Sequence, residues 1–245
     1  MIYVLHFRID GAWFVCLDEG IAPKIGDCTV LSFGISDDPN FDIEMNSKYK
    51  CRVESFDPYV TSSEFKLEGQ EKSTTVKVND KWRFHKIGLS GNKDSTKEKG
   101  TIGWITTLDE ILEYTHLTNK VIDIFKLDIE TNEWNFLVNF DVNYACKYIK
   151  QIMLETHTKP DGKRDKTFNQ LKELRKLEKC FSLFHRDTRF FQHSHWGQYG
   201  FTESEFQLHK DYKLDLSDFE NDLELVYFTL TFGELYFVNE NFLNN

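Results

Sequence analysis

The stretch CTVLSFGISDD, residues 28–38, joins an apolar run to a turn that contains one glycine and two carboxylates. A short apolar run of this kind, bounded by a turn, indicates a buried strand. Four further runs follow it, separated by helical stretches, at residues 51–56, 82–88, 121–128 and 149–155. Because strands that alternate with helices form βαβ units, the pattern predicts a doubly wound α/β fold with a mostly parallel sheet. Two later apolar runs, residues 189–193 and 223–230, are candidates for further strands.

Length, composition and charge limit the possible classes of protein. The 245 residues are 40% hydrophobic and include 22 Phe, which is enough for the core of one large domain. We expect a single domain over residues 1–245, with residues 1–26 as an N-terminal extension. The formal net charge of -10 argues against general nucleic-acid binding, which usually depends on a basic surface.

The sequence contains no sign of a membrane segment. No apolar stretch approaches the roughly 20 residues that a membrane-spanning helix needs, and the first 20 residues lack the layout of a signal peptide. The sequence identifies no compartment, so a cytoplasmic protein is the default expectation.

Cysteine and histidine spacing argues against a metal site. The five Cys are odd in number, widely spaced and form no C-x-x-C pair, so we expect neither a disulfide framework nor a zinc site. Cys28 and Cys51 begin apolar runs, where a buried thiol behaves as a small hydrophobic group. The His193-x-His195 pair matches no compact metal motif, so we expect no metal.

The turn after the first strand, with Phe33, Gly34, Ile35 and Ser36, favours one class of ligand. Glycine lets the backbone approach a ligand closely, and Gly34 is the only glycine here. Carboxylates at residues 37 and 38 stand where a dinucleotide pyrophosphate would need free helix N–H groups, which argues against NAD or FAD. A ligand that has no phosphate and carries a cationic sulfonium suits this turn better. The alternative is that these carboxylates only cap the following helix.

Asp57 ends the second strand, about 23 residues after Gly34. An acidic side chain at this place can accept hydrogen bonds from both ribose hydroxyls of a nucleoside cofactor. The pair Asp57-Pro58 is also a turn signal, so a purely structural role is the alternative.

Three carboxylates follow the fourth strand in KLDIETNEW, residues 126–134. Ionised carboxylates at a strand end are costly unless they are paired, bind a metal or face a ligand. In a doubly wound sheet this strand lies beside the first strand, at the crevice where ligands bind. We therefore assign Asp128 to the site and interpret Glu133 as a cap or ion pair on the following helix.

Glu155 and His157 end the fifth strand and are two residues apart, so both point to one face if the strand persists. A histidine with an unperturbed pKa of about 6.5 can act as a general base near neutral pH. A neighbouring carboxylate such as Glu155 should raise the pKa of His157. The candidate catalytic residues are Asp128, His157 and Glu155, and a structural role is the alternative for His157.

Several of these blocks together resemble a known family. SFGISDD (32–38), CRVESFDP (51–58) and KLDIETNEW (126–134) occur in the order found in the methyltransferase-like protein 24 family. More distantly, the sequence is similar to FkbM-type methyltransferases that depend on S-adenosylmethionine (SAM). The resemblance covers residues 13–157 and is weaker beyond them.

The resemblance implies a seven-stranded class I methyltransferase sheet whose antiparallel last strand is Leu223–Leu230. It also implies SAM near Phe33, Gly34 and Ile35, with Asp128 facing the methyl donor. The ribose would lie on Asp57, and the adenine near Gly88 and Leu89. Members of the family often carry an N-terminal membrane anchor.

We therefore expect a SAM-dependent methyltransferase that acts on oxygen, with a small molecule or a glycan-like hydroxyl as acceptor. The main alternative is a non-catalytic protein that keeps the fold as a binding or interaction module, because a fold does not determine a function. A nicotinamide-dependent oxidoreductase is disfavoured by the acidic turn.

Overall fold

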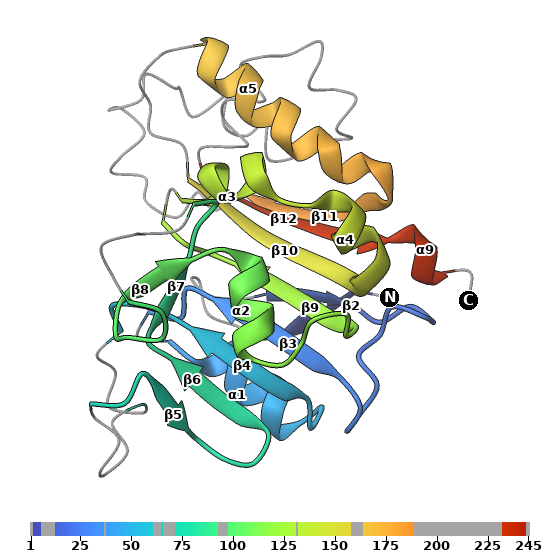
Figure 1. The fold of residues 1–245 in the computed structure, drawn as a ribbon. Helices are drawn as coiled ribbons and strands as arrows, with labels where there is room; N and C mark the ends of the chain where they lie inside the picture. Colours follow the sequence, from blue (N-terminus) through green and yellow to red (C-terminus); the bar gives the residue numbers. More distant parts are fainter. Residues whose placement is uncertain are drawn as a thin grey trace, which may run out of the picture.

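The computed structural model describes residues 2–5, 13–36, 38–60, 65, 72–92, 98–130, 132–157, 164–188 and 232–243. Within this part of the chain, an eight-stranded sheet with the order β11-β12-β10-β9-β3-β4-β6-β5 forms the centre of the fold (Figure 1). The five strands β10, β9, β3, β4 and β6 are parallel to one another, whereas β12, β11 and β5 pair in antiparallel fashion. In sheet order the strands are β11 (Phe181–Thr188), β12 (Phe232–Asn239), β10 (Ile149–His157), β9 (Ile122–Leu127), β3 (Thr29–Phe33), β4 (Arg52–Phe56), β6 (Trp82–His85) and β5 (Thr75–Lys77).

The five parallel strands confirm the predicted doubly wound arrangement, with strand ends within a few residues of the expected ones. The sheet has eight described strands rather than seven, because the short strand β5 extends the edge beside β6. Two short pairs lie outside the sheet. β1 (Ile2–Leu5) and β2 (Trp13–Cys16) are antiparallel, and β7 (Ile87–Leu89) and β8 (Trp104–Thr106) are parallel.

The antiparallel strand beside β10 is not the one expected. The structure uses Phe232–Asn239 there, while the expected segment 223–230 and the apolar run 189–193 lie outside the described residues. Residues 232–239 look less apolar because they contain Glu234, yet this side chain is fully buried. The hydroxyl of Tyr236 donates a hydrogen bond to the Glu234 carboxylate, which reduces the cost of burying it.

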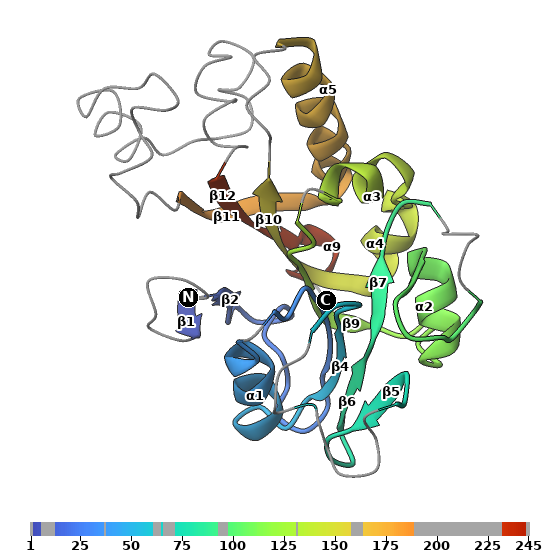
Figure 2. The same ribbon diagram turned by 90° about the vertical axis from the view of Figure 1, so that its left-hand side faces the viewer.

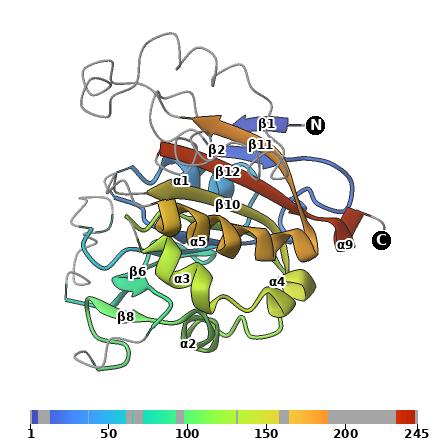
Figure 3. The same cartoon turned by 90° about the horizontal axis from the view of Figure 1, so that it is seen from above.

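Helices cover both faces of the sheet. One face carries α2 (Leu108–Tyr114), α3 (Glu133–Asn139), α4 (Val142–Tyr148) and α5 (Arg164–Arg175), and the other carries α1 (Asn40–Ser47) with the β1–β2 pair (Figures 1 and 2). Seen from above, α5, α3, α4 and α2 lie along one side of the sheet (Figure 3). A 3-10 helix (Lys176–Lys179) precedes β11, and α9 (Glu240–Leu243) follows β12. Among the described helices, none has the length and apolar character that crossing a lipid bilayer would require.

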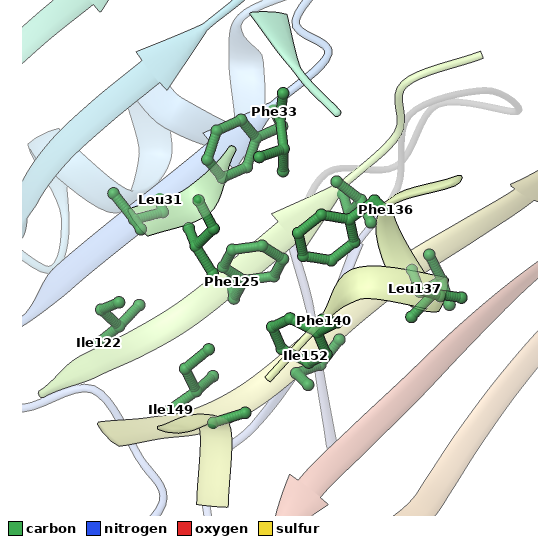
Figure 4. Packing of buried hydrophobic residues seen from close by; sticks show 14 of the residues in the cluster. Leu31, Phe33, Ile122, Phe125, Phe136, Leu137, Phe140, Ile149 and Ile152 are labelled. Atoms are coloured by element: carbon green, nitrogen blue, oxygen red, sulfur yellow. The ribbon is translucent and has the colours of Figure 1, made fainter. Parts of the chain in front are cut away.

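Stacked phenylalanines fix the strands against the helices. Phe33 of β3 and Phe125 of β9 point toward Phe136 and Phe140 at α3 (Figure 4). The ring centroids of Phe125 and Phe136 are 5.8 Å apart, and those of Phe33 and Phe125 are 5.3 Å apart. Burial of large aromatic side chains from both layers dominates the energetics of such a core. It therefore sets where the ends of β3 and β9 lie, and these ends carry the candidate site residues.

The prediction that the cysteines are unpaired thiols is wrong. Cys28 is bonded to Cys51, and Cys146 is bonded to Cys180, which leaves Cys16 as the free cysteine. Cys28 and Cys51 directly precede the neighbouring parallel strands β3 and β4, so sheet pairing brings their Cα atoms to 4.6 Å. The two cysteines of each disulfide are 23 and 34 positions apart in the sequence, respectively. They meet only because the strands and helices that carry them pack together.

Candidate functional site

A cavity of about 440 Å³ opens at the carboxyl ends of β3, β4 and β9. Open α/β sheets bind ligands at this edge, where the strand order reverses, and β3 is that point here. The volume is in the range of small-molecule sites. The lining residues are Phe33, Gly34, Ser36, Phe56, Asp57, Pro58, Tyr59, Val60, Gly88, Leu89, Ile105, Asp128, Ile129, Glu130 and Asn132.

The cavity brings together seven of the eight residues expected to bind a cofactor, and Ile35 is the exception. Ile35 is buried, and its backbone N–H donates to Asp57 instead. Sequence reasoning missed several lining residues. Tyr59 and Val60 follow the recognised Asp57-Pro58 turn and could have been inferred from it, whereas Ile105 comes from β8, for which the sequence has no local signal.

Gly34 is the residue of the turn that no larger amino acid can replace. Its φ is 75°, and a Cβ atom added here would lie 1.4 Å from the backbone oxygen of Asp128. Its N–H donates to the Phe56 carbonyl at 2.9 Å, and its own carbonyl accepts from Lys126 Nζ at 2.9 Å. A glycine is therefore required for the ends of β3 and β9 to approach this closely.

Asp57 holds the same turn in place through four backbone hydrogen bonds. Its Oδ2 accepts from the N–H groups of Ile35 (3.2 Å) and Ser36 (3.1 Å). Its Oδ1 accepts from Tyr59 (2.8 Å) and Val60 (3.0 Å). A carboxylate offers about four acceptor positions, so a ribose hydroxyl bound here would replace or share at least one of these contacts. The structural role considered for Asp57 is thus observed directly.

The acidic pair after the first strand has a structural role where it is described. Asp38 does not line the cavity, and its Oδ1 accepts from the backbone N–H of Asn40 at 3.0 Å, at the start of α1. The N-cap residue of α1 is Pro39, which makes no side-chain capping bond, so Asp38 forms a turn before the helix and is not its N-cap. Asp37 lies outside the described residues.

The predicted catalytic residues form a cluster around the imidazole of His157. Nδ1 of His157 is 2.9 Å from Oε1 of Glu133. Nε2 faces three further carboxylates, at 3.6 Å from Glu155 Oε1, 3.7 Å from Glu130 Oε2 and 4.0 Å from Asp128 Oδ1. Asp128 lines the cavity, so the cluster lies at its edge.

The cluster changes the charge of His157. Burial by itself lowers the pKa of the ring, but the hydrogen bond that the ring donates to Glu133 and the charges of Glu133, Glu155 and Asp128 outweigh burial and raise the pKa to about 9. The predicted direction of the shift is therefore confirmed. The size of the shift means that the ring carries a proton at neutral pH, and in that state it cannot accept another.

Glu133 is a site residue that sequence reasoning assigned only to the following helix. It is fully buried, and its Oε1 accepts from both the Ile129 N–H (3.0 Å) and His157. The next residue, Trp134, donates from Nε1 to the His157 carbonyl at 2.8 Å. Glu133 and Trp134, at the start of α3, thus hold the end of β10 through His157. They are 24 and 23 residues away from His157 in the sequence.

Two buried charged residues, Lys126 and Asp42, lie near the turn. Lys126, which bonds the Gly34 carbonyl, lies 4.4 Å from the centre of the Trp13 ring. Asp42 of α1 is 1% exposed, and burial raises its pKa to about 6, while the charge of Lys126 and the hydroxyls of Ser32 and Ser55 act in the opposite direction. Neither Asp42 nor this role of Lys126 was inferred from the sequence, because α1 and β9 meet only in the folded chain.

A second cavity, of about 560 Å³, lies at the opposite, amino ends of the strands and has a basic lining. Its main cations already have partners. Arg52 pairs with Glu54, Lys150 pairs with Asp123, and Lys81 donates to two backbone carbonyls. None of the predicted site residues lines it.

Comparison with known proteins gives one consistent result. Residues 5–203 match the model of a protein family described as a methyltransferase domain. The chain is 30% identical over 189 residues to "Probable methyltransferase-like protein 24" of Rattus norvegicus, covering 71% of this chain and 48% of that protein. The chain is also 30% identical over 189 residues to the Homo sapiens protein of the same name, covering 71% of this chain and 47% of that protein. The chain thus spans about half the length of these curated relatives.

Proposed function

The chain belongs to the methyltransferase domain family, which confirms the resemblance seen in its sequence, and we propose that it transfers a methyl group from SAM to a hydroxyl acceptor. The proposal includes the class I methyltransferase type of sheet, in which an antiparallel strand inserts beside the fifth parallel strand. β12 between β10 and β11 supports this assignment.

The observation that carries the proposal is the cavity at the ends of β3, β4 and β9, which Gly34 and Asp128 both line. Gly88 lets two walls of the cavity pack closely, since a Cβ added there would lie 3.0 Å from Pro58 Cγ. Asp128 and Glu130 bring negative charge to the cavity, which suits a cationic sulfonium and opposes a phosphate. Gly34, Asp57 and Gly88 would hold the nucleoside, with the ribose near Asp57 and the adenine near Gly88 and Leu89.

When bound, SAM supplies an electrophilic methyl carbon attached to a positively charged sulfur. Methyl transfer needs mainly positioning, which can contribute several kcal/mol. The residues of the chain therefore have two tasks. They orient the acceptor oxygen toward the methyl group, and they take up the hydroxyl proton.

Three residues at the edge of the cavity are candidates for these tasks. Asp128 and Glu155 offer carboxylate oxygens to the hydroxyl proton, and Asp128 is the one that lines the cavity. His157 is charged at neutral pH, so it orients these carboxylates rather than serving as the base in that state. The acceptor is proposed to be a small molecule or a glycan-like alcohol.

Calorimetric titration of the full chain with SAM, S-adenosylhomocysteine and NADH tests the cofactor assignment. We expect SAM and S-adenosylhomocysteine to bind at one site per chain, and NADH to show no binding. NADH binding without SAM binding would overturn the proposal. SAM binding without transfer to any hydroxyl acceptor would favour the alternative of a binding module.

The two disulfides support an oxidising compartment rather than the default cytoplasmic location, because cytosolic thiols are kept reduced. Thiol labelling of the protein taken from cells, before and after reduction, tests this. We expect only Cys16 to be labelled in denatured, unreduced protein. Labelling of all five cysteines would contradict the proposal.

A further inference from the structure

We propose that Asp128, Glu130 and His157, with Glu155 beside them, form a site for one divalent cation, of the Mn²⁺ type, at the edge of the methyl-transfer cavity. No motif in the sequence predicts such a site, and the sequence analysis led us to expect no metal. The cation-binding claim stands on the geometry of the cluster. Only the role of the ion in catalysis rests on the proposed function.

The first argument is the spacing of the ligand atoms. One carboxylate oxygen each from Asp128 and Glu130 and a ring nitrogen of His157 lie within 4.8 Å of one another. Nε2 lies 3.6 to 4.0 Å from three carboxylates, which is too far for good hydrogen bonds. Two ligands about 2.1 Å from a shared ion are about 3.0 Å apart at right angles and about 4.2 Å apart when opposed. The three separations between Nε2 and the carboxylate oxygens, 3.6 to 4.0 Å, fall in this interval.

The second argument is that the ligand residues belong to two neighbouring strands or follow them directly, so the sheet fixes their positions. Asp128 follows β9, Glu155 and His157 belong to β10, and the two strands pair with Leu127 opposite Leu154. This register sets Asp128 and Glu155 side by side. Glu130 follows in the turn after β9 and completes the ring of oxygens around Nε2.

The third argument is the buried partner behind the imidazole. Metal-binding histidines usually donate their other ring N–H to a carboxylate, which fixes the ring and directs the free nitrogen to the metal. Glu133 provides this contact at Nδ1 and is fully buried. Its second oxygen, Oε2, is buried without a hydrogen-bond partner in the described structure. A buried carboxylate held against the rear nitrogen of the ring matches this arrangement.

The fourth argument is the balance of charge. Within the described residues, the ion pairs formed by Asp128, Glu130 and Glu133 all lead to the single imidazole of His157. Several carboxylates gathered here repel one another, and a divalent ion relieves this repulsion when it replaces the ring proton at Nε2.

The ligand chemistry selects the type of ion. Thiolates are absent from the cluster, and carboxylate oxygens outnumber the nitrogen, which argues against a structural zinc site. Carboxylates suit Mg²⁺, Ca²⁺ and Mn²⁺, while an imidazole ligand favours a transition metal. Mn²⁺ satisfies both preferences. At this position the ion can bind and polarise the oxygen of a hydroxyl acceptor next to Asp128.

The test is titration of the EDTA-treated full chain with Mn²⁺ alone, followed by electron paramagnetic resonance and calorimetry. We expect one Mn²⁺ per chain, and Asp128→Asn and His157→Gln should each weaken binding at least tenfold. Glu133→Gln, which touches only the rear of the ring, should weaken binding about 10- to 100-fold. The matched control Asp109→Asn alters an acidic residue of α2 outside the cluster and should bind Mn²⁺ like the wild type.

A parallel titration with SAM separates this proposal from the proposed function. SAM binding with no Mn²⁺ binding, or with Mn²⁺ binding unchanged in both ligand variants, overturns the metal site and leaves the methyltransferase proposal intact. Mn²⁺ binding without SAM binding overturns the methyltransferase proposal and leaves the metal site intact. Circular dichroism confirms that each variant is folded. If one ligand variant does not fold, the other decides the outcome.

Discussion

Replacing Gly34 by alanine adds a single methyl group, and we expect this substitution to disrupt the candidate site more than the same substitution at any other glycine that lines it. The residue has a φ of 75°, and its added Cβ would lie 1.4 Å from the Asp128 oxygen and 2.6 Å from the Asp128 carbonyl carbon. Because real Cβ contacts are longer than about 3 Å, the turn after β3 and the end of β9 would have to move apart by more than 1 Å.

The cost can be assembled from the contacts at this turn. A left-handed φ costs a residue with a Cβ about 1–2 kcal/mol. The separation also strains the hydrogen bonds from Gly34 N–H to Phe56 O and from Lys126 to Gly34 O, each with a net contribution of about 1 kcal/mol. We therefore expect Gly34→Ala to lower the free energy of unfolding by about 3–4 kcal/mol and to abolish measurable SAM binding.

Gly26 is the matched control. Its φ is 82°, but an added Cβ would meet no atom within 4 Å. Gly26→Ala should therefore cost only the backbone term of about 1–2 kcal/mol and leave SAM binding unchanged. Urea unfolding and calorimetric titration with SAM measure both quantities. Equal loss of stability in the two variants, or normal SAM affinity in Gly34→Ala, would refute the reasoning.

Three further predictions concern the surroundings of the site. The folded-state pKa of Asp42, about 6 against an ordinary 3.8, means that the folded chain keeps a proton which the unfolded chain loses. Stability should therefore fall by about 3 kcal/mol between about pH 4 and pH 6.5 relative to Asp42→Asn, and parallel urea curves for the two proteins would contradict this. Reducing both disulfides should lower the free energy of unfolding by about 3–4 kcal/mol for each loop, measured as a drop in Tm, and an unchanged Tm would disprove their contribution. Asp57→Asn should weaken SAM binding by about 1.5–3 kcal/mol, since it disturbs charge-assisted bonds in the turn, and wild-type affinity by calorimetry would remove Asp57 from the site.

The five parallel strands and the location of the site could be predicted because their signals are local. Each strand is a short run of apolar residues, and the rule that ligands bind at carboxyl strand ends then groups Gly34, Asp57 and Asp128 without further information. Seven of the eight expected cofactor residues line one cavity for this reason. Gly34 is also readable from sequence, because only glycine adopts this turn without a steric cost.

Other features depend on residues that are distant in sequence and were decided only by the tertiary structure. The pairing of Cys28 with Cys51 follows from the neighbouring positions of β3 and β4, not from cysteine spacing. Strand β12 contains a buried glutamate and was overlooked in favour of a more apolar run. The contact between Glu133 and His157 required α3 to pack against the end of β10.

The physical reason for this division is that local conformational propensity depends on neighbours in the sequence, whereas packing depends on contacts between distant elements. The sequence by itself determined the five parallel strands, the turn that needs a glycine and the strand ends that carry charge, because these depend on neighbours along the chain. Only the tertiary structure decided which charges face one another and how deeply each is buried, because burial and Coulomb energies depend on distances between different elements. Carboxylates from two separate segments, residues 128–133 and residue 155, therefore become one cluster around His157 when β9, β10 and α3 meet.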